Sequence, residues 1–563
     1  MDENLKIDNG LNLAFDVSEE DRTKSINLNE GYLGEDRWEV IIRYIGNIDR
    51  ISKQAISVTL LLNNFAIIIA TKDNVSILST FPEIVYIEKP RRIYFEVLNS
   101  IRTSCISPVQ SQLELFGEVI MISFIDSGID YFNSVFLDQN NISRIDYILD
   151  QTDNSGTPPV GYNIGTLYTN EAINSSIETR VPLKTRDLSG HGTAVASVAA
   201  GNFATTPNSN IGIATKSRIM AVKLGNPLPN SFPKSSELMQ AIDFSIRTAI
   251  EINIPLVINI SFGNTYGSHD GTTLFEEYIN SVSGIGKTTI VVGTENEGAS
   301  AGHFSTKLTD SVETRANLAV GEYEPSINVQ LWKNYGDEFL IELIAPSGKR
   351  TGYLIKQNIK YRLDNTEVLV YFGNPTPFST ATEIYFDFIP TGDYIDSGIY
   401  QFVFTPVRLI LGEINMWLPV ESALNNTTFL NPSPEVTLTV LSTALRVISV
   451  GAYDAYLGSY AEFSGRGYLR EINLVKPDIV APGVNILAAA SFGTTAVSGT
   501  SFATPVVSGS AALLMKWGIV KENDLYLYAE KVKAYIIKGA RRLPGVREWP
   551  NREFGDCVKL VLG

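Results

Sequence analysis

The segment from Gly117 to Gly293 alternates continuous apolar runs with amphipathic segments, and this alternation constrains the fold more than any other feature of the chain. The apolar runs are EVIMISFID, RIMAVKL, IPLVINISF and TTIVVGT, and helical patterns such as ELMQAIDFSIRTAIEIN occur among them. A strand that is apolar at every position is buried on both faces, as in a parallel sheet covered by helices. The alternation therefore predicts an α/β fold with a doubly wound, mostly parallel sheet.

The pattern changes between about residues 311 and 430. Stretches such as SINVQLWKN, EFLIELIAP, TEVLVYFG and EIYFDFI alternate apolar and polar residues between turn residues, which is typical of an antiparallel β-sandwich. The α/β pattern resumes with RVISVGAY and ends in helices. We therefore expect an inserted β domain over 309–432, between two parts of one α/β domain at 101–308 and 433–563.

The first 100 residues form a separate module. From residue 38 to 95 the patterns follow the order strand, helix, strand, strand, helix, strand, which predicts a split βαβ arrangement. Asn63 and Asn64 lie between two apolar strands and suit a tight turn. We expect this module to be ordered over about 38–95 and loosely ordered before that.

Composition excludes several classes of function. The net charge of −16 argues against a nucleic-acid partner, because binding phosphates needs a basic surface. Cys105 and Cys557 have no metal-ligand spacing, and no D-x-D loop suggests calcium, so we predict no metal and no cofactor. The N-terminus lacks a signal-peptide pattern and the longest apolar run is too short to cross a bilayer. We expect an intracellular product without a membrane span.

Three short motifs carry chemistry. Asp126 ends a buried strand, at the edge where open α/β sheets form their sites. His191 lies between glycines at the start of a helix, and Ser501 starts another helix in SGTSFATP. Alone, each has an ordinary explanation as a turn residue, a surface residue or a helix cap. Together, in the order Asp, His, Ser, they predict a catalytic triad in the order found in subtilisin.

These motifs resemble those of the subtilisin-like (subtilase) serine proteases. DSGID, GHGTAVA and GTSFATP are similar to the family's three catalytic motifs, and the resemblance covers roughly 105–305 and 435–540. NISFG resembles the family's substrate-binding strand, which implies that Ser261, Phe262 and Gly263 bind substrate. GTENEG resembles the stretch that carries the oxyanion-hole asparagine, which implies this role for Asn296. We expect Ser498 and Thr500 to support the turn rather than to take part in catalysis.

The resemblance also implies roles for the other regions. The N-terminal module resembles a subtilase propeptide, which implies a self-processing zymogen whose propeptide binds as an inhibitor and is cut between about 96 and 104. A propeptide combined with a large β insertion, here expected to be a jelly roll, is similar to the clostridial Csp spore-germination proteases. Active members of that family cleave the precursor of a spore cortex-lytic enzyme. This implies a serine endopeptidase packaged in the spore, with that precursor as its protein substrate.

Alternatives follow from the same family. It contains members that lack catalysis and act in germinant signalling, so a non-catalytic scaffold or pseudoprotease is the alternative function. All three triad positions are filled in this chain, which favours an active enzyme. His269 and His303 belong to no family motif, and we expect them to be exposed to solvent or to make ordinary polar contacts.

Overall fold

A computed structural model describes residues 5–92, 113–202, 212–225, 232–357, 359–470, 472–490, 493–543, 546–555 and 558–560. The chain divides into two compact units. One comprises 1–92, 264–274 and 297–440, and the other comprises 93–263, 275–296 and 441–563. The expected propeptide junction at 96–104 and both cysteines lie outside the described residues.

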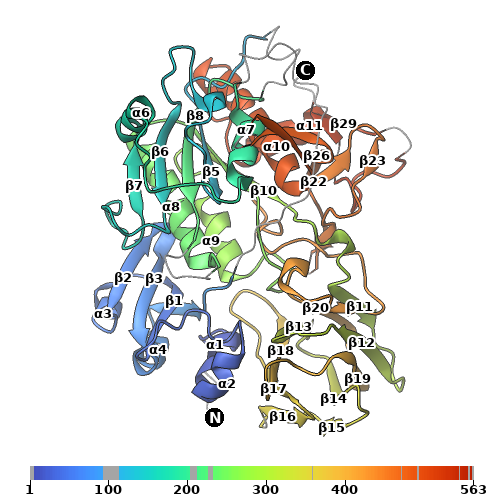
Figure 1. Cartoon of the computed structure of the whole chain (residues 1–563). Coiled ribbons are helices and arrows are strands. Elements are labelled where there is room, and N and C mark those ends of the chain that lie inside the picture. The colour runs from blue at the N-terminus through green and yellow to red at the C-terminus, as the bar shows by residue number, and fades with distance from the viewer. Residues whose placement is uncertain are drawn as a thin grey trace. The chain divides into compact units, whose positions relative to one another are not determined.

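The second unit is built on an 11-stranded sheet in the order β29-β30-β26-β22-β10-β9-β5-β8-β6-β7, with β23 paired to β22 (Figure 1). The pairings from β6 through β30 are parallel, whereas β7, β23 and β29 pair antiparallel. The predicted doubly wound, mostly parallel sheet is therefore confirmed. The strands are β5 (Met121–Asp126), β6 (Ile145–Asp150), β7 (Thr166–Thr169), β8 (Arg218–Lys223), β9 (Leu256–Ile260), β10 (Thr288–Gly293), β22 (Ile448–Asp454), β23 (Ser459–Tyr460), β26 (Ile479–Pro482), β29 (Ala540–Arg541) and β30 (Val558–Leu560).

Helices cover this sheet, and two hairpins extend from it. The helices are α6 (Asn170–Thr179), α7 (His191–Ala200), α8 (Ser235–Glu251), α9 (Leu274–Val282), α10 (Thr500–Met515) and α11 (Glu530–Gly539), with the short 3₁₀ turn η2 (Ser134–Phe136). The π-helical segment η5 (Lys516–Val520) continues α10. The hairpins are β24 (Gly467–Leu469) with β25 (Leu474–Lys476), and β27 (Ile486–Ala489) with β28 (Thr494–Val497).

The central helix α10 is buried along its whole length. Small residues allow its close packing: a Cβ on Gly509 would lie 2.7 Å from the Cβ of Ile213. Within the described part of the chain, Thr500–Val520 is the single helical stretch long and apolar enough to cross a membrane. The protein itself buries 83% of its most apolar window, as expected for the core helix of a folded domain.

The N-terminal module has the predicted order of elements. Strands β1 (Arg37–Tyr44), β2 (Ser57–Leu61), β3 (Phe65–Thr71) and β4 (Ile84–Glu88) form an antiparallel sheet in the order β2-β3-β1-β4, with helices α3 (Asp49–Ser52) and α4 (Lys72–Ser79). Asn63 and Asn64 lie in the short turn η1 (Leu62–Asn64) with φ angles of 59° and 63°, as a tight turn between two strands requires.

The expectation of a loosely ordered segment before residue 38 is wrong. Two helices, α1 (Asn9–Asp16) and α2 (Glu19–Lys24), precede the sheet. Asp8 caps α1 by accepting hydrogen bonds from the backbone N–H groups of Gly10 and Leu11, and Leu11, Leu13 and Ala14 are fully buried. Their cluster also contains Leu369, Tyr371, Tyr385 and Ile389 of the inserted β domain. The sequence signal was weak because the apolar face of α1 is short and its partners lie far away along the chain.

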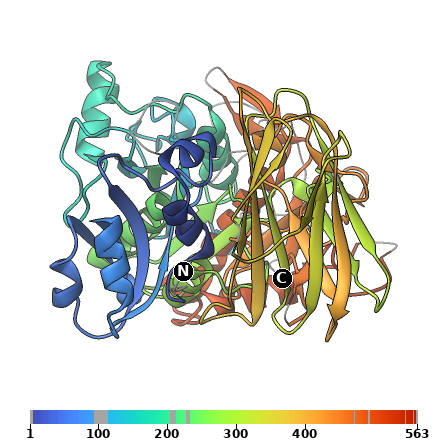
Figure 2. The same ribbon diagram turned by 90° about the horizontal axis from the view of Figure 1, so that it is seen from below.

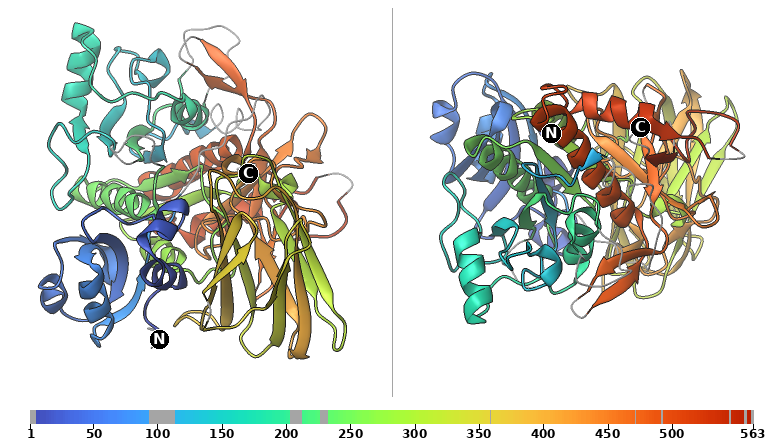
Figure 3. Two further views of the ribbon diagram at one scale, coloured as in Figure 1. Left: turned by 60° about the horizontal axis from the view of Figure 1, so that its bottom comes forward. Right: turned by 90° about the horizontal axis from the view of Figure 1, so that it is seen from above.

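The inserted β domain consists of two antiparallel sheets that share one core (Figures 2 and 3). One has the order β11-β20-β13-β18-β17-β16 and the other β15-β14-β19-β12-β21. The insertion begins before the expected boundary at 309, because β11 starts at His303 and pairs with β20. The strands are β11 (His303–Lys307), β12 (Thr314–Val320), β13 (Ile327–Asn334), β14 (Glu338–Ile344), β15 (Arg350–Tyr353), β16 (Lys360–Leu363), β17 (Thr366–Phe372), β18 (Ala381–Pro390), β19 (Gly398–Arg408), β20 (Glu413–Trp417) and β21 (Thr428–Phe429), with turns η3 (Glu297–Ala299) and η4 (Glu421–Ala423).

Candidate active site

Asp126 and His191 form a buried pair in the α/β unit. Asp126 is the last residue of β5, and His191 is the first residue of α7. The Nδ1 atom of His191 lies 2.7 Å from the Oδ1 atom of Asp126, within hydrogen-bonding distance. Gly192 makes this approach possible, because a Cβ there would lie 2.1 Å from the carbonyl oxygen of Gly128.

Asp187 ties the end of β5 to the start of α7. Its Oδ1 accepts hydrogen bonds from the Ser127 hydroxyl at 2.8 Å and from the Gly190 N–H at 2.9 Å. Its Oδ2 accepts hydrogen bonds from the N–H and hydroxyl of Thr193 at 2.8 and 2.6 Å. Ser127 in turn accepts a hydrogen bond from the N–H of Gly192. One carboxylate therefore fixes both chain segments that carry the Asp126–His191 pair.

Ser501 lies in the first turn of α10 and is fully buried. Its hydroxyl donates a hydrogen bond to the carbonyl oxygen of Ser261 at 3.0 Å. The next residue, Phe502, has its ring 5.4 Å from the His191 ring, so the start of α10 lies beside the imidazole. The turn before the helix depends on Gly499, whose φ of 141° is unfavourable for residues with a side chain.

Asn296 follows β10 and contacts the same turn. Its Oδ1 accepts a hydrogen bond from the N–H of Thr500 at 3.0 Å, which assigns the oxygen and nitrogen of this side chain. The Nδ2 atom lies 3.2 Å from the position that a Cβ on Gly499 would take. The amide nitrogen thus lies beside the turn that carries Ser501, where it can donate to an oxygen of a bound group.

Ser261, Phe262 and Gly263 follow β9 and are buried. The hydroxyl of Ser261 donates a hydrogen bond to the carbonyl oxygen of Ser501 at 3.2 Å and accepts one from Asn259 Nδ2 at 2.9 Å. Asn259 also accepts a hydrogen bond from the Ser508 hydroxyl at 2.8 Å. The end of β9 is therefore held against α10 by a continuous chain of side-chain hydrogen bonds.

The electrostatic environment favours the charged form of His191. Burial by itself lowers the pKa of this imidazole, but the charge and hydrogen bond of Asp126, with a smaller effect of Asp187, more than offset it. The pKa of His191 is therefore raised above its usual value of 6.5. A histidine in this setting accepts a proton more readily than one in water.

The other two histidines lie elsewhere, in the unit that contains the β insertion. Both are buried, with exposed fractions of 0% for His269 and 2% for His303, so of the two expected settings solvent exposure does not apply. The expected polar contacts are present: His269 Nε2 pairs with the carbonyl oxygen of Thr265, and His303 Nε2 with Asn415 Oδ1. Both rings stack on Trp417, an apolar contact that no local sequence pattern indicates.

Sequence reasoning missed Asp187 and Ser127. Asp187 lies four positions before His191 in RDLSGH, and this spacing to a helix start was the available signal. A carboxylate ahead of a helix commonly caps it, so the residue type alone gave no reason to connect it with Asp126. The role of Asp187 depends on its hydrogen bond with Ser127, a contact between two segments about 60 positions apart.

Two family descriptions match this chain. Residues 5–91 match the Csp protease B prodomain, and residues 117–380 and 413–556 match the subtilase family. Among solved structures, the Clostridium perfringens CspB protease is 36% identical with a TM-score of 0.74. That match covers 81% of this chain and 94% of the other.

Curated relatives match over a short region. The membrane-bound transcription factor site-1 protease of Mus musculus is 41% identical over 106 residues, and the subtilisin-like protease SBT3.8 of Arabidopsis thaliana is 39% identical over 93 residues. These regions are 18% and 14% of this chain, and they span only 10% and 12% of the lengths of the two relatives.

Proposed function

The chain belongs to the subtilase family of serine endopeptidases and carries a Csp-type prodomain, and from this premise we propose that Asp126, His191 and Ser501 are its catalytic triad. The observation that carries the proposal is the buried Asp126–His191 pair with a 2.7 Å contact. The ring contact between His191 and Phe502 supports the placement of Ser501 beside that pair.

Each residue has a defined task in the proposed reaction. The Ser501 hydroxyl turns from the Ser261 carbonyl toward His191, and its oxygen attacks the carbonyl carbon of the scissile peptide while His191 Nε2 takes the proton. Asp126 holds the imidazole in the required tautomer and stabilises the imidazolium. His191 then gives the proton to the leaving amine. Water, activated by the same imidazole, hydrolyses the acyl-enzyme and regenerates the Ser501 hydroxyl.

Groups next to Ser501 stabilise the oxyanion and bind the substrate backbone. Asn296 Nδ2 and the N–H of Ser501 stabilise the negative oxygen of the tetrahedral intermediate. The hydrogen bond from Thr500 to Asn296 Oδ1 supports this orientation of the amide. Ser261, Phe262 and Gly263 bind the substrate backbone, and their position directly after β9 supports that role.

The remaining regions fit a zymogen. The N-terminal module is the propeptide, which is separated by self-cleavage between about residues 96 and 104 and then stays bound as an inhibitor that restrains activity. The β insertion is a jelly roll, which the strand orders β11-β20-β13-β18 and β15-β14-β19-β12 support. The physiological substrate is the precursor of a spore cortex-lytic enzyme, and the protein is packaged in the spore. The link to the CspB protease supports these last two assignments.

Self-processing tests the function. The wild-type chain and Ser501→Ala are purified in parallel and compared by denaturing gel and N-terminal sequencing. We expect two fragments from the wild type, divided near residue 100, and one band from Ser501→Ala. The processed wild type is then incubated with a purified cortex-lytic precursor, which we expect it to cut once or a few times. A wild-type chain that stays intact and inert would support the non-catalytic alternative.

A further inference from the structure

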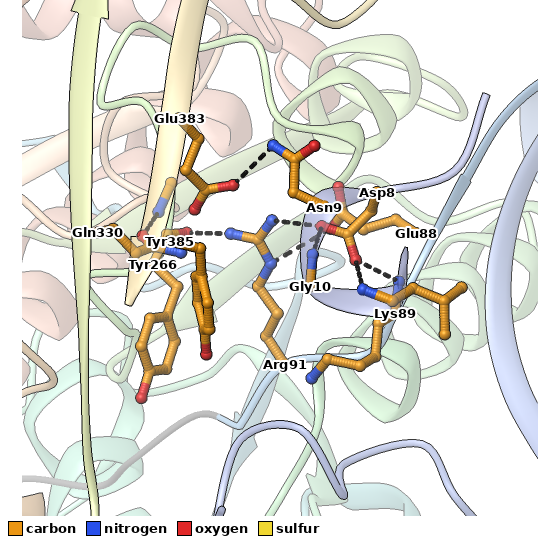
Figure 4. A network of polar contacts seen from close by, with 12 residues as sticks. Asp8, Asn9, Gly10, Glu88, Lys89, Arg91, Tyr266, Gln330, Glu383 and Tyr385 are labelled. Carbon is orange, nitrogen blue, oxygen red and sulfur yellow. Dashed lines mark hydrogen bonds and ion pairs between the residues drawn. The ribbon is translucent and has the colours of Figure 1, made fainter. Parts of the chain in front are cut away.

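Arg91 occupies a partly buried socket that the mechanism does not use, with its side chain 17% exposed (Figure 4). Its Nη1 donates a hydrogen bond to the carbonyl oxygen of Tyr266 at 2.7 Å. Its Nη2 and Nε lie 3.7 Å from carboxylate oxygens of Asp8 and Glu88, respectively. Its charge also attracts Glu383, a buried carboxylate of the β insertion.

The socket joins three separate parts of the chain. Asp8 and Glu88 come from the prodomain, Tyr266 from the segment 264–274, and Glu383 from β18 of the insertion. Asn9 connects the prodomain with the insertion by donating a hydrogen bond to Glu383 at 2.9 Å. Arg91 thus interacts with groups from all three parts.

The segment 264–274 is held from both sides. From the prodomain, the Arg92 carbonyl accepts a hydrogen bond from Asn264 Nδ2 at 2.9 Å, next to the Arg91–Tyr266 contact. From the insertion, Gln330 accepts a hydrogen bond from the N–H of Gly267, and Ser379 donates one to Asp270. Along the chain, Asn264 directly follows Gly263, the last residue of the proposed substrate-binding stretch.

Removing the Arg91 guanidinium would raise the free energy of the folded chain. Buried carboxylates are stable only when they are protonated or are paired and hydrogen-bonded. In this socket Asp8, Glu88 and Glu383 lie around the Arg91 guanidinium, and Lys89 supplies a second positive charge near Asp8. The fork of five N–H donors lets arginine reach groups on several sides, which a lysine ammonium cannot do with the same geometry. Loss of Arg91 therefore loosens both the chain leaving β4 and the segment that follows the substrate-binding stretch.

We propose that Arg91 is a positioning residue for self-processing: its socket fixes the outgoing prodomain chain and the 264–274 segment together, and so sets which peptide bond is cut. This inference rests on the proposed function. It adds to that function the contacts that determine which peptide bond of the prodomain tail is cut. The prodomain tail is then positioned by a fixed point upstream of the cut, in addition to any preference of the active site for particular side chains.

The test compares self-processing of the wild type with Arg91→Met, Arg91→Lys and Glu383→Gln. We expect cleavage of Arg91→Met to slow by roughly tenfold or more, because small misplacements of a reacting bond are costly. Intact mass spectrometry of the large fragment should give one N-terminus for the wild type and several for Arg91→Met. For Arg91→Lys and Glu383→Gln, the cleavage rate and the number of N-termini should lie between those of the wild type and those of Arg91→Met. After processing, the fragments should share the wild-type kcat on a short peptide.

The matched control is Arg50→Met, which removes a prodomain arginine whose side chain is 58% exposed and which pairs with Glu83. This variant should be processed like the wild type. A single, unchanged cut site at the wild-type rate in Arg91→Met would overturn the proposal. A uniform loss of rate with an unchanged cut site would also contradict it, because that result indicates a purely structural role.

A second measurement, of hydrogen exchange, does not depend on catalytic activity. Hydrogen exchange is compared between the full-length Ser501→Ala chain and the same chain carrying Arg91→Met. We expect faster exchange at the amides of Tyr266 and Gly267, with unchanged exchange in the β5 and β9 strands. Unchanged exchange at 264–274 would overturn the anchoring role even if the wild type never cleaved itself. In contrast, wild-type and Arg50→Met chains that both stay uncut would indicate failure of the proposed peptidase function.

Discussion

The Nδ1 atom of His191 lies 2.7 Å from the Oδ1 atom of Asp126, and each of the two side chains is only 1% exposed. In such a dry setting the carboxylate strongly favours the imidazolium form, because water does little to screen the pair. This relationship gives the protein a histidine with a raised pKa, which has a direct consequence for the pH range of activity.

The acid limb of the activity profile follows from this pKa. Burial lowers the pKa of His191, but Asp126 more than offsets it, so the net pKa lies above 6.5. A protonated imidazole cannot accept the Ser501 proton, so kcat/KM should fall as pH decreases through a value above 6.5. Hydrolysis of a fluorogenic peptide by the processed protein across the pH range measures this limb. A limb centred well below 6.5 would contradict the assignment of His191 as the base.

Asn296→Ala should reduce turnover with little effect on substrate binding. The side chain contributes one donor to the oxyanion, and loss of such a donor costs roughly 10²–10³ in kcat. Steady-state kinetics on a peptide should therefore show a lower kcat at nearly constant KM. The exposed Asn140→Ala variant serves as the control and should behave as the wild type. A wild-type kcat for Asn296→Ala would remove Asn296 from the proposed mechanism.

Asp187→Asn should weaken catalysis and shift its pH profile. The substitution removes a negative charge that raises the pKa of His191, and it weakens the acceptors for hydrogen bonds from the segments that follow β5 and begin α7. We expect a lower kcat/KM and an acid limb displaced toward lower pH. The same peptide assay measures kcat/KM and the position of the acid limb. A melting curve of the variant shows whether it is folded, so that unfolding is not mistaken for a catalytic effect. An unchanged acid limb would show that Asp187 acts on stability alone.

The stability of the prodomain with the β insertion should decrease as pH rises. Burial raises the pKa of Glu383 from 4.5 to about 7, although Arg91 and Asn9 oppose this shift. The folded chain therefore holds a proton that the unfolded chain has released. The stabilising contribution is full below pH 4.5 and is lost as pH rises through about 7. The shift corresponds to about 3 kcal/mol of unfolding free energy.

Thermal unfolding of the Ser501→Ala chain between about pH 4.5 and 8 tests this linkage. Glu383→Gln should flatten the fall in stability with pH, because glutamine cannot release a proton. Glu88 and Asp387, whose pKa values burial also raises to about 7, should leave a residual slope. An identical pH dependence in the two chains would show that Glu383 keeps an ordinary pKa.

The α/β sheet and the three motif residues were predictable because their signals are local. Continuous apolar strands identify a parallel sheet, and glycine-rich turns mark the helix starts at His191 and Ser501. The turn at Asn63 and Asn64 was predictable for the same reason, since both residues tolerate positive φ.

The features that were not predictable depend on contacts between distant segments. Helix α1 is stabilised by side chains of β17 and β18, far away in the sequence, so its own short apolar face carried little signal. His269 and His303 are buried against Trp417, and Arg91 interacts with Glu383 from a different part of the chain. Such pairs leave no periodic pattern in a single sequence.

Labelling of the processed protein with a fluorophosphonate probe tests the central claim most directly, because this reagent reacts with a serine only when it is activated as a nucleophile. The account predicts one covalent adduct, located by peptide mass spectrometry on Ser501, and no adduct in Ser501→Ala or His191→Ala. The labelling is done after the bound propeptide has been removed from the processed protein. An absence of labelling in this propeptide-free, folded wild-type protein, or an adduct on another residue, would contradict the account.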